Sequence, residues 1–423
     1  MQFTQKKLKN GLRVIHIPMK GNPTATVLVL VETGSKYETK KINGLSHFLE
    51  HMCFKGTVKR PTAGDISGEL DGLGAQYNAF TGQEYTGYYA KSDAKHFKKI
   101  FDVVSDIYLN STFPELEMHK EKGVIIEEIN MYEDTPPRHV QDLMMELLYG
   151  DQPAGWNIAG PRENIRKMER KDFIDYKKAH YVPEATIVVV AGPVSAGEVM
   201  REVNKTFAKT KKAKKAGKKK TIDKQSAPAA LIKFKKTDQT HFVLGFRAYD
   251  VHDKRNGALT VLAAVLGAGM SSRLFHKLRE EMGVCYYVRS APDSYTDHGF
   301  LQISSGVDNK RVKEVITAIL KECKRLVDEA VPEKELNKVK ELIIGNMKMG
   351  LEATDDVANF YGGQAVLREK ITTPEKKAEN IRKIKAKDIQ KIAAEIFQDG
   401  KLNLSLIGPF KKKEEFLPIL KLE

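Results

Sequence analysis

The sequence lacks both a hydrophobic run long enough to cross a membrane and a cysteine framework. A membrane-spanning helix needs ~18–20 consecutive apolar residues, and no segment of the 423 residues approaches that length. The three cysteines, Cys53, Cys285 and Cys323, form no C-x-x-C pair, which argues against a disulfide scaffold and favours a reducing compartment. Residues 1–9 contain no apolar segment of the kind that a secretory signal requires. We therefore expect a cytoplasmic globular protein with no membrane partner.

Acidic residues are almost absent from one basic segment. The whole chain carries a net charge of +15, and Lys205–Lys224 holds ten lysines against one acid, Asp223, which leaves only +6 for the rest. Such a segment cannot bury an apolar face, so it predicts a solvated linker. Because no aromatic residue except Phe207 lies among the lysines, base stacking is unsupported and we expect no nucleic-acid partner.

The linker falls near the middle of the chain and separates two similar halves. Three short patterns recur 216 residues later: Glu163–Lys167 as Glu379–Lys383, Lys171-Asp172 as Lys387-Asp388, and Gly192-Pro193 as Gly408-Pro409. A shared register over three patterns indicates an internal duplication.

The hydrophobic patterns of the two halves predict the same order of elements. In each half two strands are followed by two helices, two further strands, a long helical region and a final strand. The expected strands are 13–17, 26–32, 76–80, 85–90, 186–191, 231–234, 242–248, 286–290, 299–304 and 402–407. This order predicts an α+β fold with two homologous lobes related by a pseudo-twofold axis, each a mainly antiparallel sheet covered by helices. The expected boundaries are 1–204 for the first lobe, 205–228 for the linker and 229–423 for the second lobe.

The most specific local pattern is His47-Phe48-Leu49-Glu50-His51, which lies in a stretch with helical apolar periodicity. Residues i and i+4 share a helix face, so both imidazoles can reach one zinc ion at ~2.0–2.1 Å. Glu50 stands beside the second histidine, where a carboxylate suits a general base acting on water. A catalytic zinc needs a third protein ligand and one open position.

The segment Glu121–Glu128 supplies candidates for the third ligand. Its spacing leaves Glu121, Glu127 and Glu128 open, because Glu121 and Glu128 share a helix face while Glu127 is turned about 100° away. One residue of the facing pair can bind the metal while the other orients the site through a hydrogen bond.

The run His47–Thr57, HFLEHMCFKGT, resembles the signature of the insulinase/pitrilysin family of inverted-motif zinc peptidases, the inverzincins. That family includes the mitochondrial processing peptidase beta subunit and short bacterial homologues. In the family the third ligand is a glutamate about 76 residues beyond the second histidine. The resemblance therefore implies His47, His51 and Glu128 as ligands of one zinc ion per chain, Glu50 as catalytic base and Glu121 as a supporting acid.

The same resemblance implies further site residues. Asn78, Ala79 and Phe80 are similar to the family's edge strand, where a substrate peptide adds as an extra strand. Arg279 and Tyr286 have the spacing of an arginine and a tyrosine that bind substrate carbonyl oxygens in the family. This segment departs from the family pattern, because Cys285 stands where glycine or alanine is usual and Tyr287 offers a second phenol.

The implied function is that of a zinc endopeptidase which hydrolyses unfolded peptides or oligopeptides in an enclosed chamber by means of metal-activated water. Family chains of this length pair, so we expect a homodimer in which Arg279 and Tyr286 act on the partner's zinc site, with a heterodimer as the alternative. A second hypothesis is a non-catalytic assembly subunit of a processing-peptidase-like complex. Such subunits usually lose the zinc residues, all of which this sequence retains.

Overall fold

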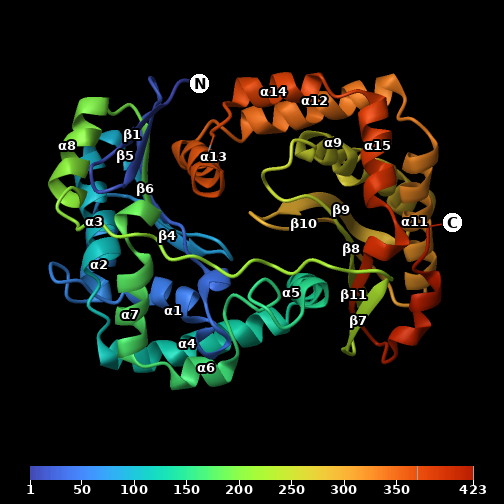
Figure 1. The fold of residues 1–423 in the computed structure, drawn as a ribbon, viewed down its shortest axis with the longest axis horizontal. Helices are drawn as coiled ribbons and strands as arrows, with labels where there is room; N and C mark the ends of the chain where they lie inside the picture. Colours follow the sequence, from blue (N-terminus) through green and yellow to red (C-terminus); the bar gives the residue numbers. More distant parts are fainter. Residues whose placement is uncertain (369, 423) are drawn as a thin grey trace. The chain divides into compact units, whose positions relative to one another are not determined.

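Two compact units make up the computed structural model, which describes residues 1–368 and 370–422 (Figure 1). Unit 1 contains residues 1–129, 156–219 and 348–374, and unit 2 contains residues 130–155, 220–347 and 375–423. Each unit is built around one sheet covered by helices, which confirms the predicted α+β class with two lobes.

The sheet of unit 1 has six strands in the order β1-β2-β6-β3-β5-β4. Their bounds are β1 Thr4–Lys7, β2 Arg13–Pro18, β3 Thr24–Val31, β4 Gln76–Thr81, β5 Thr86–Asp93 and β6 Thr186–Gly192. All neighbouring pairs are antiparallel except β2 and β6. The hydrophobicity pattern missed β1, because its side chains are all polar and exposed and it joins the sheet through its backbone.

The sheet of unit 2 repeats this topology with five strands in the order β7-β11-β8-β10-β9. Their bounds are β7 Ala229–Phe234, β8 Gln239–Arg247, β9 Cys285–Ser294, β10 Gly299–Asp308 and β11 Leu402–Gly408. The parallel pair β7–β11 corresponds to β2–β6, and the edge strand β9 corresponds to β4. Identical order and strand direction support the duplication that the repeated sequence patterns indicate.

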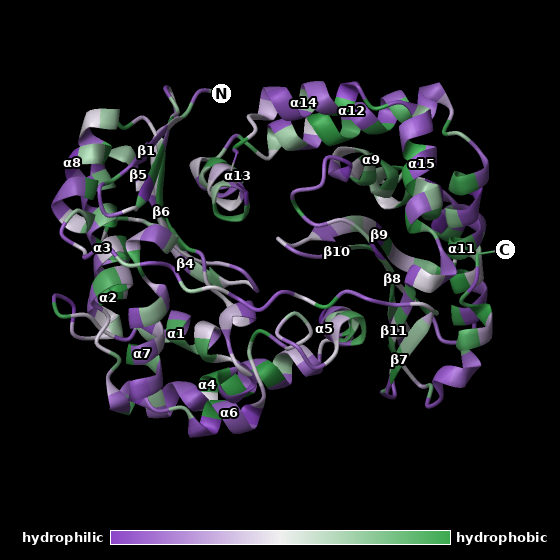
Figure 2. Cartoon of the chain, in the orientation of Figure 1, coloured by the Kyte–Doolittle hydropathy of each residue, from purple (hydrophilic) through white to green (hydrophobic). Residues whose placement is uncertain are grey.

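Both sheets carry apolar residues on their two faces. Strand β6 is buried along its whole length and is hydrophobic from Ile187 to Ala191 (Figure 2). In unit 1, Val27 and Val29 of β3 face a core shared with helices that include α1 (Leu45–Cys53), α3 (Phe97–Asn110), α7 (Arg170–His180) and α8 (Ala196–Phe207). Leu28 and Leu30 face the opposite side, where they pack against α13 (Thr354–Leu367). Successive side chains of a strand point to opposite faces of the sheet, and here both sets are apolar. Each face therefore needs a layer of helices to cover it.

The second helix layer of each sheet comes from the other half of the sequence. Helix α13 packs on β3 and β6 of unit 1, whereas α5 (Pro136–Tyr149) packs on β7, β8 and β11 of unit 2. The approach is close, because a Cβ atom on Gly362 of α13 would lie 2.7 Å from the Leu30 side chain. The units are thus not the contiguous lobes 1–204 and 229–423. Segment 130–155, from the first half of the sequence, belongs to unit 2, and segment 348–374, from the second half, belongs to unit 1. In the described residues each covers the second face of the sheet of its unit.

Most of the lysine-rich segment is exposed, as expected of a solvated linker, but two of its lysines pair with carboxylates of unit 1. Helix α8 continues to the buried Phe207, so the linker begins later than residue 205. Lys215 pairs with Glu32 at 2.7 Å, and Lys218 pairs with Glu84 at 3.1 Å and lies over the Tyr37 ring. A lysine in a segment without apolar residues can still be held in place when a carboxylate from another element faces it. The net charge of the segment does not predict such a contact.

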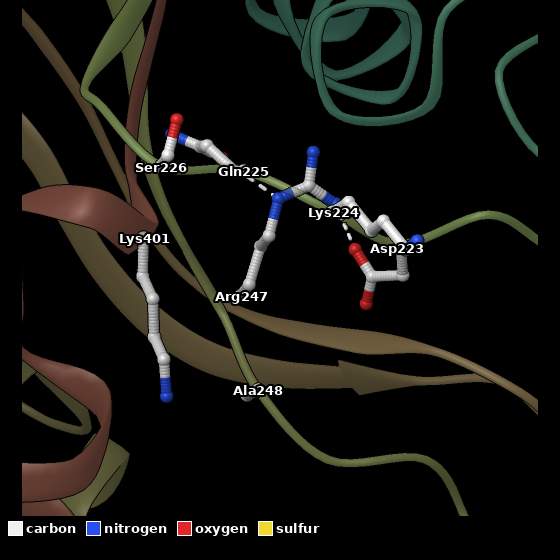
Figure 3. Close-up of a pocket in the computed structure, with 7 residues that line it drawn as sticks. All are labelled: Asp223, Lys224, Gln225, Ser226, Arg247, Ala248 and Lys401. Carbon is white, nitrogen blue, oxygen red and sulfur yellow. Dashed lines mark hydrogen bonds and ion pairs between the residues drawn. The ribbon is translucent and has the colours of Figure 1, made fainter.

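The end of the linker is attached to unit 2 in a similar way. Arg247 of β8 pairs with Asp223, and its Nε donates to the Gln225 side chain at 2.7 Å (Figure 3). The linker residues Asp223–Ser226, together with Arg247, Ala248 and Lys401, line a pocket of about 680 Å³. The guanidinium donors of Arg247 bind the linker and the Leu148 carbonyl. The contacts at this pocket therefore attach the end of the linker to β8.

Helix α1, which carries the H-x-x-E-H pattern, begins at a buried carboxylate. Glu38 accepts the backbone N–H groups of Gly44 at 2.9 Å and Ser46 at 2.6 Å, and also the Asn43 amide at 3.0 Å. These N–H groups have no intrahelical acceptor, since they belong to the first turn. Burial raises the pKa of Glu38 in spite of these hydrogen bonds, which favour its charged form. One side chain therefore fixes where α1 starts.

We expect Glu38→Ala to lower the free energy of unfolding by about 2–4 kcal/mol, because buried N–H groups lose their acceptor. Urea unfolding measures this value, with Glu414→Ala at an exposed position of the chain as the matched control. Equal stabilities for the two variants would show that Glu38 does not hold the start of α1.

Candidate metal centre

Helix α1 presents its two histidines because its apolar residues fix its orientation. Leu45, Phe48, Leu49 and Met52 follow helical spacing and are fully buried, and the Phe48 ring meets the Phe173 ring edge-on at 4.7 Å between centroids. His47 and His51 lie on a neighbouring face of the helix, with side chains only 12% and 21% exposed. That face meets α4 (Glu115–Glu133), the helix that contains the candidate acids.

Three ligand atoms converge between α1 and α4. The Nε2 atoms of His47 and His51 lie 3.3 Å apart, and Glu128 Oε2 lies 3.6 Å from the first and 3.5 Å from the second. Atoms that each lie ~2.0–2.1 Å from one tetrahedral zinc ion are about 3.3–3.4 Å from one another. The triangle therefore has the size that zinc requires, and two nitrogens with one carboxylate oxygen form a donor set typical of catalytic zinc.

Glu128 and Glu127 have different surroundings, although the sequence spacing left both open as ligands. Glu128 joins the two histidines in the one group of potential metal ligands found among residues 1–368 and 370–422. Glu127 lies on the exposed side of α4. Cys53 is fully buried in the core and is not part of the group.

Glu121 does not belong to the ligand triangle but contacts one of its histidines. Its Oε1 atom lies 2.9 Å from Nδ1 of His51, and its Oε2 atom lies 2.6 Å from the ammonium of Lys55. A carboxylate on Nδ1 fixes the histidine tautomer that leaves Nε2 for a metal. Burial raises the pKa of Glu121, but hydrogen bonds from His51 and Lys55 outweigh it, so the net shift is downward. For His51, burial lowers the pKa, and the bond to Glu121 with three nearby carboxylates raises it overall.

Glu50 stands beside the ligand triangle and is held by the edge strand. The hydroxyl of Thr81, the last residue of β4, donates to Glu50 Oε2 at 2.5 Å. Burial raises the pKa of Glu50, while the hydrogen bond from Thr81 and the charges of the two histidines act against this rise. A half-buried carboxylate beside a candidate metal site but not among its ligand atoms is suited to move protons.

Strand β4 forms the edge of its sheet beside α1. It pairs with β5 on one side, so its other side can pair with an extended peptide. Asn78 is exposed and its side-chain oxygen accepts the backbone N–H of Ala79 at 2.9 Å. The Phe80 ring packs across Gly87 and meets Tyr85 edge-on at 5.8 Å between centroids. Asn78 and Ala79 therefore lie at the open edge, whereas Phe80 helps to anchor the strand.

Comparison with known families matches the chain over most of its length. A model of the insulinase family, peptidase family M16, matches residues 13–162, and a model of the peptidase M16 inactive domain matches residues 167–343. The chain belongs to the insulinase family, peptidase family M16.

Relatives in this family carry names that refer to zinc. The chain is 35% identical to the uncharacterized zinc protease YmxG of Bacillus subtilis over 405 residues, 95% of this chain and 97% of the relative. It is 32% identical to an uncharacterized zinc protease of Rickettsia bellii over 413 residues, 96% of this chain and 98% of the relative.

Solved structures show the same fold. A protease from Helicobacter pylori superposes with a TM-score of 0.89 at 23% identity, covering 96% of this chain and 99% of that one. A peptidase M16 inactive domain from Pseudomonas fluorescens gives 0.89 at 15% identity, covering 97% and 98%. The M16 fold thus persists where sequence identity is low.

Unit 2 of this M16 chain carries apolar residues at the positions that correspond to the ligands. The 216-residue repeat relates His47, Glu50 and His51 to Ala263, Leu266 and Gly267 of α9 (Asn256–Gly267), all of which are buried. It relates Glu128 to Ile344 of α12 (Glu333–Met349), which is also buried. The duplicated helices therefore form core in unit 2 instead of a metal site.

Arg279 and Tyr286 both lie in unit 2, at the start of its edge strand. Arg279 is in a π-helical turn, His276–Glu281. Such turns are rare in proteins overall, and those that occur are often at functional sites. Its guanidinium donates to the carbonyl of Cys285 at 2.8 Å, so it is held next to Tyr286. Tyr286 is 67% exposed, whereas Tyr287 stacks on His241 and its hydroxyl lies 3.2 Å from that ring. Of the two phenols, Tyr286 is the accessible one.

Two residues of this M16 site were missed by the sequence analysis as functional candidates. Thr81 ends the strand pattern, and Lys55 follows His51 by four residues, which is the spacing that links His47 to His51. That helical spacing was a usable signal for Lys55, while the contact of Thr81 with Glu50 depends on tertiary structure alone.

We expect Thr81→Val to lower kcat for peptide hydrolysis about tenfold while zinc content and KM change little, because Glu50 loses a hydrogen bond to its charged form. Steady-state kinetics on a fluorogenic peptide measures this effect. Thr81→Ser keeps the hydroxyl and should retain most of the activity. A kcat of Thr81→Val equal to that of the unmodified chain would contradict the role of Thr81.

Proposed function

We propose that this chain is a zinc-dependent endopeptidase that hydrolyses unfolded peptides by attack of water. The observation that carries the proposal is the triangle of His47 Nε2, His51 Nε2 and Glu128 Oε2, with sides of 3.3–3.6 Å, beside a half-buried Glu50. Its membership of the M16 family and the zinc-protease names of its relatives support the same reaction.

Different residues of unit 1 have different roles in the proposed hydrolysis of a peptide. His47, His51 and Glu128 would hold the ion, and a bound zinc supplies a Lewis acid that acidifies water. Glu50 would accept a proton from the attacking water and return it to the leaving amine. The open edge of β4 binds an extended peptide by backbone hydrogen bonds, which makes recognition independent of side chains. Thr81 keeps Glu50 at the end of that strand.

Arg279 and Tyr286 are proposed to stabilise the substrate carbonyl in a second copy of the chain. A guanidinium and an exposed phenol donate hydrogen bonds to carbonyl oxygens and to a developing negative charge. Support for this role comes from their shared location at the edge strand of unit 2. The proposed assembly is a homodimer that encloses a chamber, and the three buried, unbridged cysteines support a reducing compartment such as the cytoplasm.

The Peptidase M16 inactive domain that matches residues 167–343 keeps one alternative under consideration, a non-catalytic assembly subunit. The two functions differ in metal content and in the effect of the catalytic base. Metal analysis and one substitution separate them.

We expect one zinc per chain by atomic absorption, and we expect Glu50→Gln to keep that zinc while turnover falls about 10²–10⁴-fold, because the proton carrier is lost. Glu115→Gln, at an exposed position at the start of α4, is the matched control. Hydrolysis by Glu50→Gln at the control rate would exclude Glu50 as the base, and absence of zinc from the unmodified chain would favour the non-catalytic alternative.

We expect a mixture of His51→Ala chains and Arg279→Ala chains to regain activity that neither has alone, because a mixed dimer contains one complete pair of residues. Peptide hydrolysis is measured after mixing, with dimer exchange verified by native mass spectrometry. Mixed dimers without activity would contradict the action of Arg279 on a second chain.

A further inference from the structure

A series of alternating basic and acidic side chains joins α1 to α4 and continues past the candidate metal ligands. His47 faces Glu128, His51 faces both Glu128 and Glu121, and Lys55 faces Glu121. The steps follow the helices, because 47, 51 and 55 are spaced by four and 121 and 128 by seven. Lys55 lies just beyond the end of α1, where its N–H still bonds to the Met52 carbonyl at 3.2 Å.

The two oxygens of Glu121 are held by different partners. Oε1 lies 2.9 Å from Nδ1 of His51 and Oε2 lies 2.6 Å from the Lys55 ammonium. The Glu121 side chain is only 6% exposed and that of Lys55 is 23% exposed, so water screens this ion pair weakly. A carboxylate with both oxygens held cannot rotate without breaking one of these contacts.

We propose that Lys55 is a positioning residue of the metal centre, which holds Glu121 so that His51 keeps Nε2 directed at the ion. This inference rests on the proposed zinc site and adds a residue to it.

A purely structural tether between the two helices is the competing role for Lys55. Such a tether would change stability and leave the metal affinity of the folded chain unaltered. The positioning role instead makes zinc affinity depend on Lys55 through Glu121, so the effects of changing the two residues must not add.

The experiment measures the zinc dissociation constant by competition with a chromophoric chelator. Outer partners of metal ligands are worth 10–100-fold in affinity, so we expect Lys55→Met to weaken zinc binding about tenfold or more. Lys55→Arg should restore most of the affinity because it keeps the charge. The matched control is Lys59→Met, which removes an exposed lysine paired with Asp102 and should bind zinc as the unmodified chain does.

The double variant Lys55→Met/Glu121→Gln decides between the two roles. We expect it to bind zinc no more weakly than Glu121→Gln alone, because Lys55 has then lost the group through which it acts. In cobalt-substituted protein, Lys55→Met should also alter the visible absorption bands, which report ligand geometry. Circular dichroism of the metal-free chains confirms folding, and Lys55→Gln serves as a second uncharged variant if Lys55→Met is unstable.

Two outcomes would overturn the inference. Zinc affinity of Lys55→Met and Lys55→Gln equal to that of Lys59→Met would reduce Lys55 to a tether, as would additive losses in the double variant. If the unmodified chain binds no zinc at all, the proposed zinc site itself fails, and this result is distinct from a site that binds zinc without help from Lys55.

Discussion

The contact between α1 and α4 is the interaction on which the metal centre depends. Within α1 the helix geometry alone places His47 and His51 on one face, but the third ligand arrives from a helix that begins more than sixty residues later. Distances of 3.3–3.6 Å among the three atoms leave little tolerance, because a shift of about 1 Å would break tetrahedral coordination. The packing around these helices therefore has to be rigid.

Several buried groups supply that rigidity around α1. Glu38 fixes the first turn, and the Tyr176 hydroxyl lies within 2.8 Å of both Ser46 on the helix and Thr33, two residues after β3. On the opposite side, Glu121 connects His51 to Lys55. These polar groups are buried and hydrogen-bonded, which gives a defined geometry that apolar contacts alone do not specify.

The duplicated fold uses equivalent helices for different purposes. In unit 2, α9 is buried along almost its entire second half, from Val261 to Gly267, so the helix that carries ligands in unit 1 contributes to the core. Unit 2 instead presents Arg279 and Tyr286 at its edge strand, the counterpart of β4. One architecture thus offers a helix with candidate metal ligands in one copy and hydrogen-bond donors beside a strand edge in the other.

Much of the fold followed from local patterns. Ten strands and the α+β class came from the apolar patterns of the strands and helices, and the repeat came from three short patterns that recur after 216 residues. Three features did not follow. Strand β1 has no apolar pattern, the exchange of α5 and α13 depends on which sheet face remains uncovered, and the docking of Lys218 depends on Glu84 being nearby.

The sequence by itself determined the pair of histidines, the adjacent Glu50 and the acids on one face of α4, because helical spacing relates residues that are close in the chain. Helical spacing left Glu127 and Glu128 open, and the family resemblance implied Glu128. The tertiary structure places Glu128 at the histidines, and it alone revealed the contacts of Thr81 with Glu50 and of Lys55 with Glu121. The physical reason is that these contacts join separate elements, and their distances are fixed by the packing of the whole core, which no local pattern encodes.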